Sequence, residues 1–295
     1  MAVGLTLTLA VLKLPNFAHA ELITIGAYAF TELINFYAFG PFVAVVVAIV
    51  FGSVTALGGE LLVFSPLKSR KASLYILILA SFALGLILRY SIYIFASEYN
   101  ALFLSNLVSN NILFTFGGFP VSTLFAWVIP VTVIVVISVH LLLNNTLIGK
   151  SMRAMESNFD LSRVSGINTR RITLFTWIIV GALAGLGGAF WSIQTQVYPE
   201  IGFAVLLDIF AVVVLAGLTS FYGTLVGAYV ISFSENLFMG WLNSTFGISL
   251  AYQPIIPFIV ITAVLLIRPA GLSTTGNNAG PLSYIKSILE RKSSE

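Results

Sequence analysis

The chain has 295 residues, of which 58% are hydrophobic and only 8% are charged, and its mean hydropathy is +1.02. Soluble domains are nearer half apolar and a quarter charged, so this composition excludes a water-soluble surface. The formal net charge is only +3, and the absence of cysteine together with two histidines leaves little for a metal centre. We therefore expect no metal, no cofactor and no nucleic-acid partner.

Apolar segments of about 20 residues, the length that crosses roughly 30 Å of hydrocarbon, recur along nearly the whole chain. They are apolar on every face, unlike the alternating strands of a membrane barrel, and therefore predict an all-α, polytopic helix bundle. Nine spans result if every segment crosses. Eight result if the first and seventh segments are half-helices. The segments are Val3 to Leu14, Leu22 to Phe39, Phe42 to Phe64, Leu74 to Phe95, Leu124 to Leu143, Ile172 to Gln196, Val205 to Leu218, Thr224 to Leu242 and Pro254 to Ile267.

A polar sequence, Pro15 to Glu21, separates the first two apolar segments. Polar groups at membrane depth need a partner or water, so this sequence predicts a bent or broken helix junction. Two interpretations stay open for Asn16, His19 and Glu21. They hold a gate or the helix packing near a transport pathway, or they form an ordinary loop and helix cap.

Basic residues concentrate in three parts of the chain: residues 68–71, residues 150–171 and the tail from residue 268. Even numbers of predicted spans separate these groups. The connections at 96–122, 197–203 and 243–253 contain no lysine or arginine. Because basic loops stay in the cytoplasm, we predict that all three groups and the C-terminus are cytoplasmic.

The stretch from residue 147 to 171 is long for a connection in a chain with short loops. Gly149 to Ser151 ends like a nucleotide-binding loop, but Asn144 replaces that motif's first glycine and a membrane helix precedes it, so we reject a nucleotide site. Gly166 predicts a helix stop, after which Asn168 or Thr169 caps a new helix. This stretch is the best candidate docking surface.

Isolated charges within apolar segments are the other candidates. Asp208 must face protein or water at its depth, as pathway or packing polarity. Arg89 and Glu235 are buried polar partners or reach towards an interface. Small residues at Gly181, Gly185, Gly187 and Gly188, and again at Gly223 and Gly227, predict closely packed helices. No hydrolase motif appears, so an enzyme is not expected.

Several ordered segments carry a family resemblance: Asn16 to Glu21 followed by Gly26 to Tyr28, Pro66-Leu67, Gly149 to Ala154 through Gly166 to Asn168, Tyr198 to Phe203, and Arg268 to Leu272. In these the chain resembles the branched-chain amino acid (leucine/isoleucine/valine) permease family of ABC importers. The chain departs from the family pattern at three places. Ala20 stands where the family has glycine, Asp208 where it has a basic residue, and residues 216–220 where it has a glycine-rich turn. The family's first helix begins further upstream, which suggests a misassigned start codon.

The resemblance implies a transmembrane permease domain over residues 1–272 and a cytoplasmic tail over 273–295. It implies that residues 147–171 hold the coupling helices that fit a separate ATPase subunit, with Arg153, Glu156, Asn158, Gly166, Ile167 and Asn168 as site residues. The implied partners are a second, related permease subunit, two ATP-binding subunits and an extracytoplasmic substrate-binding protein in the cell membrane. The alternative is a secondary transporter of small solutes, coupled to protons through Asp208, Glu21 or His19.

Overall fold

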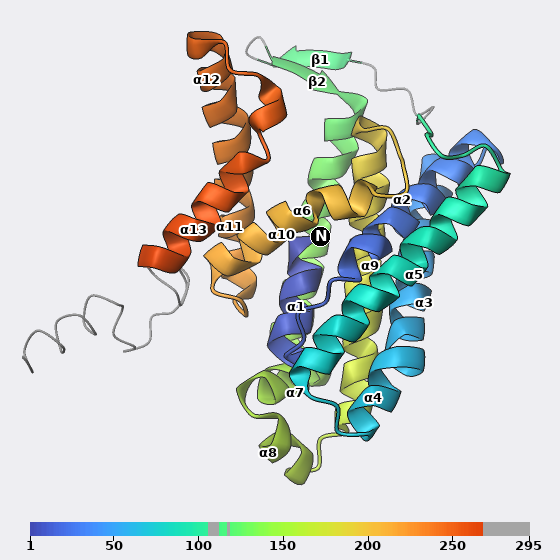
Figure 1. Cartoon of the computed structure of the whole chain (residues 1–295), viewed down its shortest axis with the longest axis vertical. Helices are drawn as coiled ribbons and strands as arrows, with labels where there is room; N and C mark the ends of the chain where they lie inside the picture. Colours follow the sequence, from blue (N-terminus) through green and yellow to red (C-terminus); the bar gives the residue numbers. More distant parts are fainter. Residues whose placement is uncertain (106–111, 117–118, 268–295) are drawn as a thin grey trace, which may run out of the picture. The chain divides into compact units, whose positions relative to one another are not determined.

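The computed structural model describes residues 1–105, 112–116 and 119–267 of the chain, so the predicted tail at 273–295 lies outside the described residues. Each predicted apolar segment contains a helix (Figure 1). The helices are α1 (Ala2–Leu12), α2 (His19–Asn35), α3 (Pro41–Gly59), η1 (Glu60–Phe64), α4 (Ser65–Ser69), α5 (Leu74–Glu98), α6 (Thr123–Asn145), α7 (Leu147–Ser157), α8 (Phe159–Val164), α9 (Thr169–Gln194), α10 (Ile201–Ala216), α11 (Phe221–Phe233), η2 (Ser234–Phe238), α12 (Met239–Phe246), η3 (Leu250–Tyr252) and α13 (Ile255–Ile267).

Five helical stretches within the described residues are long and apolar enough to cross a membrane: Pro41–Ser69, Leu74–Glu98, Phe125–Asn145, Thr169–Gln194 and Phe221–Phe246. Shorter apolar helices occur at Ala2–Leu12, Ile201–Ala216 and Leu250–Val264. Hydrogen bonds inside each helix satisfy its backbone, which hydrocarbon requires of any spanning segment. The chain is therefore a multi-pass helical membrane protein.

A short β-hairpin was not predicted. Strand β1 (Ile112–Phe116) pairs antiparallel with β2 (Phe119–Ser122), with Ile112 opposite Ser122 and Phe116 opposite Phe119. Residues 96–122 were predicted as a plain connection because they contain no long apolar run. The hairpin is rich in β-branched and aromatic residues, which favour strands, but it is too short to register as a span.

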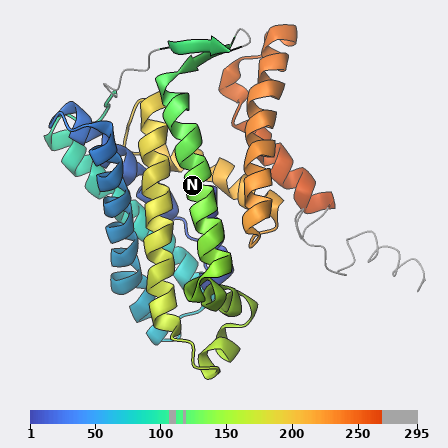
Figure 2. The ribbon, with the colours of Figure 1, turned by 180° about the vertical axis from the view of Figure 1, so that it is seen from behind.

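The chain forms two compact units. The first contains Val11–Ala204 and Met1, and the second contains Ala2–Ala10 and the described chain from Val205 onward. In the first unit α9 packs against both α2 and α3, and Figure 2 shows α9 beside α3. Their contacts run through glycines: a side chain on Gly52 would meet the Gly181 carbonyl oxygen, and one on Gly26 would meet Gly185. The predicted close packing at Gly181 and Gly185 is confirmed.

In the second unit α10, α11 and α13 share an apolar cluster that includes Val212, Leu215 and Ile231. The hydroxyl groups of Thr6 in α1 and Thr224 in α11 are hydrogen-bonded at 2.7 Å, both buried. A side chain on Gly227 would meet the Val212 carbonyl oxygen at 2.9 Å. This unit therefore uses the same device of small residues at helix contacts.

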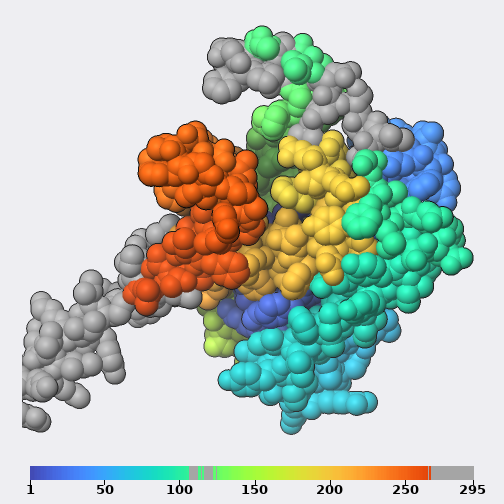
Figure 3. All heavy atoms as spheres, turned by 45° about the horizontal axis from the view of Figure 1, so that its top comes forward, coloured from blue at the N-terminus to red at the C-terminus, as the bar shows by residue number. Residues whose placement is uncertain are grey.

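Large apolar side chains cover the outer surface of α5, which is visible in teal in the space-filling view (Figure 3). Exposed examples are Leu79, Ile87, Ile94 and Phe95. A water-soluble protein rarely exposes so many large apolar side chains along one helix, whereas a membrane helix presents them to lipid. The surface of α5 is therefore consistent with its assignment as a membrane span.

Candidate functional site

Residues 147–171, which were predicted to couple the chain to an ATPase and are called the coupling segment below, consist of α7, α8 and the start of α9. Its first helix is fixed by Thr146, whose Oγ1 accepts a hydrogen bond from the Gly149 N–H at 3.0 Å. The backbone of Gly149 lies directly against the carbonyl groups of Leu142 and Leu143, where a larger residue does not fit. Helix α7 is therefore held close to the end of α6.

Helix α7 is amphipathic. Met152 and Met155 are fully buried, and they anchor one face against the rest of the first unit. On the other side Arg153 is exposed, and its Nη1 donates to Asn144 Oδ1 at 2.8 Å. Glu156 is half-buried. The partner of Arg153 belongs to α6, so this hydrogen bond joins the two helices.

Asn158 separates the two short helices. Its N–H donates to the Ala154 carbonyl at 3.0 Å and ends α7, while its Oδ1 accepts from the Leu161 N–H at 2.9 Å and caps α8. Ser162 Oγ also donates to the Asn158 carbonyl, at 2.8 Å. The chain thereby turns sharply at one residue, and α8 is held as a separate rigid element.

Helix α8 presents apolar side chains outward. Leu161 is 62% exposed and Val164 is 85% exposed. Phe159 is also exposed, and Asp160 and Arg163 lie among these residues. Exposed apolar side chains within a charged surrounding are typical of a protein contact surface. This short helix is the most exposed apolar element of the coupling segment.

The predicted helix stop and restart is confirmed. Gly166 has φ +85°, a left-handed conformation that glycine adopts at little cost. The Ile167 N–H donates back to the Ser162 carbonyl at 3.1 Å. Asn168 then accepts from the Arg171 N–H at 3.1 Å and caps α9, which begins at Thr169. The coupling segment is thus joined rigidly to the longest membrane helix of the block formed by α2, α3 and α9.

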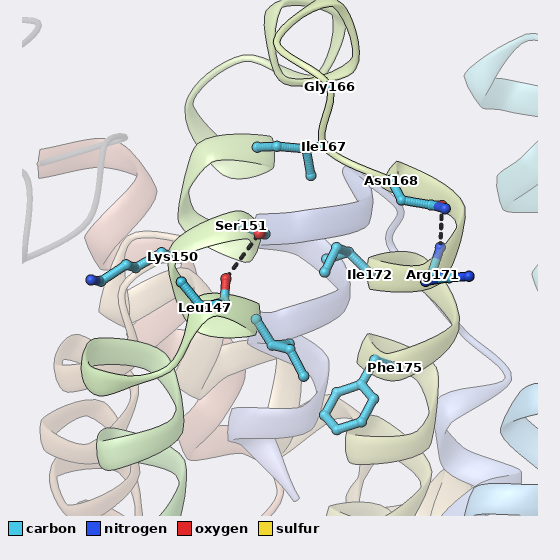
Figure 4. Close-up of a pocket in the computed structure, with 10 residues that line it drawn as sticks. Leu147, Lys150, Ser151, Gly166, Ile167, Asn168, Arg171, Ile172 and Phe175 are labelled. Atoms are coloured by element: carbon cyan, nitrogen blue, oxygen red, sulfur yellow. Dashed lines mark hydrogen bonds between the residues drawn. The ribbon is translucent and has the colours of Figure 1, made fainter.

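A pocket of about 670 Å³ lies between α7 and the first turns of α9 (Figure 4). The side chains of Ile167, Ile172 and Phe175 line it, and Lys150 and Arg171 extend away on opposite sides. The pocket thus has an apolar lining, and two basic residues lie beside it. No group of three or more potential metal ligands occurs in the described part of the chain.

Most of the predicted helix junction at Pro15 to Glu21 is buried in the first unit, with Asn16, His19 and Glu21 at 0% exposure. Asn16 Oδ1 accepts from the Ala18 N–H at 3.1 Å, at the entry to α2. His19 Nε2 lies 3.2 Å from the Met1 carbonyl oxygen. Asn16 Nδ2, His19 Nδ1 and Glu21 Oε2 are buried without a hydrogen-bond partner among the described residues. The N-cap residue of α2 is Ala18, and no side chain caps this helix, so Asn16, His19 and Glu21 lie in buried packing and not in a helix cap.

Glu21 pairs with Arg89 of α5, and this pairing was not predicted. The Arg89 Nη2 lies 2.6 Å from Glu21 Oε1, and Nε donates to the same oxygen at 3.0 Å. Both residues were separate candidates in the sequence. The sequence did contain a clue: Glu21 and Arg89 carry opposite charges, and each is isolated in an apolar helix. Two opposite charges at membrane depth are expected to pair.

Asp208 belongs to the second unit and lies half-buried in α10. Glu235 lies in the π-helical turn η2 of the same unit, and its Oε1 is buried without a partner among the described residues. The predicted site residues are thus in three places: the coupling segment, the helix junction with Arg89, and the acidic residues of the second unit.

Comparisons with known proteins agree on one family. Residues 1–265 match the family described as the permease component of branched-chain amino acid transport systems. The probable branched-chain amino acid transport permease LivH of Methanocaldococcus jannaschii is 33% identical over 92% of this chain and 87% of its own. The high-affinity branched-chain amino acid permease BraD of Pseudomonas aeruginosa is 24% identical over 92% and 90%.

The ribose import permease RbsC of Escherichia coli is 31% identical over 45% of this chain and 42% of its own. No solved structure matches the chain. These matches support a transport subunit and give no support to the proton-coupled alternative. The chain therefore belongs to the family of branched-chain amino acid ABC transport permeases, and it is a transport subunit and not an enzyme.

Proposed function

We propose that the chain is one of two permease subunits of an ATP-driven importer of branched-chain amino acids. A second, related permease chain completes the pathway, two ATP-binding subunits drive it, and an extracytoplasmic binding protein delivers the substrate. The observation that carries the proposal is the family match over residues 1–265, joined to relatives named for branched-chain amino acid transport over nearly their whole length. The match to a ribose permease covers less than half of the chain, so it supports ribose as the substrate less than the longer matches support branched-chain amino acids.

The coupling segment is the proposed contact with an ATP-binding subunit. Its exposed apolar residues Leu161 and Val164 would enter an apolar groove, and Arg163 would contact the groove's rim. Asn158, Gly166 and Asn168 would hold α8 at a fixed angle to α9 through the caps and the left-handed turn described above. Movement of the ATP-binding subunit would then be transmitted to a membrane helix without being absorbed by a flexible loop.

The same proposal assigns eight or nine spans to residues 1–272 and a cytoplasmic tail to residues 273–295. The distribution of lysine and arginine supports cytoplasmic positions for the coupling segment, for residues 68–71 and for the C-terminus. Asn16, His19, Glu21 and Asp208 are the proposed pathway or helix-junction residues, because polar groups at membrane depth mark routes for polar solutes.

The test reconstitutes this chain with its partner permease, the ATP-binding subunits and the binding protein in liposomes. Leucine uptake and ATP hydrolysis are measured together. In Val164→Asp, a buried charge at the proposed contact should remove the ATP-binding subunits from the complex and reduce uptake by at least about tenfold. Ser165→Asp adds the same charge at the next exposed position and is the matched control.

Uptake that requires ATP and fails in Val164→Asp but not in Ser165→Asp supports the proposal. Uptake that proceeds without the ATP-binding subunits overturns the importer assignment. Full assembly and uptake by Val164→Asp overturns the assignment of α8 as the contact while leaving the importer assignment in place.

A further inference from the structure

The ion pair between Glu21 and Arg89 is bonded incompletely on both sides. Arg89 uses Nε and Nη2 on one carboxylate oxygen, Oε1, whereas a guanidinium fork commonly engages both oxygens of its partner. Glu21 Oε2 is consequently buried without a hydrogen-bond partner among the described residues, and Arg89 Nη1 takes no part in the pair. In the part of the chain that the structure describes, the pair therefore has one carboxylate oxygen without a partner and one guanidinium nitrogen that it does not use.

The two members of the pair differ in access. The Glu21 side chain is 0% exposed, whereas the Arg89 side chain is 13% exposed. The centroid of the Phe203 ring lies 4.3 Å from the Arg89 guanidinium carbon, and Phe203 is 46% exposed. The second ion pair of this unit is built differently, because Lys68 Nζ contacts both oxygens of Glu60, at 3.2 and 3.0 Å. That pair leaves no carboxylate oxygen free.

We propose that Glu21 and Arg89 form a binding site for the zwitterionic backbone of an amino acid in transit. The substrate ammonium group would bind Glu21 Oε2, which has no partner within the described residues, and the substrate carboxylate would bind Arg89 Nη1, which the pair does not use. The Phe203 ring would contact the apolar side chain. This inference rests on the proposed function, and it assigns the recognition of the substrate's charged groups to two residues of the permease.

Electrostatics favour a zwitterion over a singly charged ligand. A buried ion pair is already compensated, so an added single charge would leave one uncompensated charge in a low-dielectric site. A zwitterion adds one charge of each sign and leaves the site neutral. The site also gives the ammonium group and the carboxylate a hydrogen-bonding partner each, in place of the water that they lose on entering the membrane. The site therefore selects ligands that carry both charges close together.

The test uses the purified transporter complex without its binding protein, so that the permease site is measured alone. Thermal stability is recorded with increasing leucine, with isoamylamine, which lacks the carboxylate, and with 4-methylpentanoate, which lacks the ammonium group. The variant is the double substitution Glu21→Gln and Arg89→Gln, which removes both charges and leaves no lone buried charge. The matched control is Glu60→Gln, at the pair whose carboxylate has no free oxygen.

We expect leucine to raise the melting temperature of the native complex and of Glu60→Gln, and both single-charge analogues to fail. In the double variant the leucine affinity should fall at least about tenfold, because each lost charged hydrogen bond contributes that much or more. An unchanged leucine response in the double variant overturns the inference, as does equal binding of the analogues. Leucine uptake by proteoliposomes of the double variant distinguishes failure of this site from failure of the proposed function. ATP-dependent uptake that persists with native kinetics supports the proposed function and refutes this site.

Discussion

The glycine contacts of the first unit lead to a prediction with an internal control. Gly52 and Gly58 both lie in α3, but their surroundings differ. A Cβ atom on Gly52 would lie 3.1 Å from the Gly185 Cα and 3.2 Å from the Gly181 carbonyl carbon, and closer still to the Gly181 oxygen. A Cβ atom on Gly58 would have nothing within 4 Å. The two substitutions to alanine therefore differ only in the packing that they disturb.

Gly52→Ala should lower the free energy of unfolding by about 1–3 kcal/mol, the usual cost of an added methyl group in a packed core. The clashing atoms are backbone atoms of α9, so rotation of a side chain cannot relieve the clash. Gly58→Ala should be neutral or should stabilise by about 0.5–1 kcal/mol, because alanine has the higher helix propensity.

Unfolding of the purified chain by a denaturing detergent, followed by circular dichroism, measures both variants in one experiment. The ranking is the decisive quantity, since both variants share the same helix and the same reference state. If Gly52→Ala is as stable as Gly58→Ala, the backbones of α3 and α9 are not in contact, and the close packing of this unit is refuted.

Three further predictions concern single contacts. Asn168→Ala should destabilise the start of α9 by about 1 kcal/mol and speed amide exchange in its first turn, whereas Asn168→Ser should retain the cap; equal exchange in both variants would refute the cap. Gly166→Ala should cost about 1–2 kcal/mol through its left-handed backbone alone, since nothing lies within 4 Å, so an unchanged melting temperature would contradict the observed φ. Phe64→Ala should cost about 3–5 kcal/mol and change the fluorescence of Trp177, because the buried rings stack with centroids 5.2 Å apart; native fluorescence in this variant would show that the stack does not form.

The helices could be predicted because hydrocarbon imposes a length and an apolar composition on each span. The observed ends lie within a few residues of the predicted ones for most segments, as for the segment predicted at Leu124 to Leu143 and observed at Thr123–Asn145. The π-helical turns at Glu60–Phe64 and Ser234–Phe238 could not be predicted in this way. Their hydrogen-bond pattern does not change the spacing of the apolar residues, so the sequence gives no indication of them.

The same contrast applies to the candidate sites. The turn at Gly166 and the cap at Asn168 were predicted because both depend on residues within a few positions of each other. The Glu21–Arg89 pair joins residues 68 positions apart, and one sequence does not say which lone charge meets which. The glycines likewise predicted close helix packing, but the sequence does not say which helix lies against each of them.

The backbone contacts among α2, α3 and α9 have a mechanical consequence. Helices joined by ordinary side chains can slide past one another as those side chains change rotamer. Helices whose backbones meet through Gly26, Gly52, Gly181 and Gly185 cannot do so, because a shift of one residue, about 1.5 Å, would bring a side chain against the opposite main chain. These three helices must tilt as a single piece when the surrounding bilayer becomes thinner or thicker.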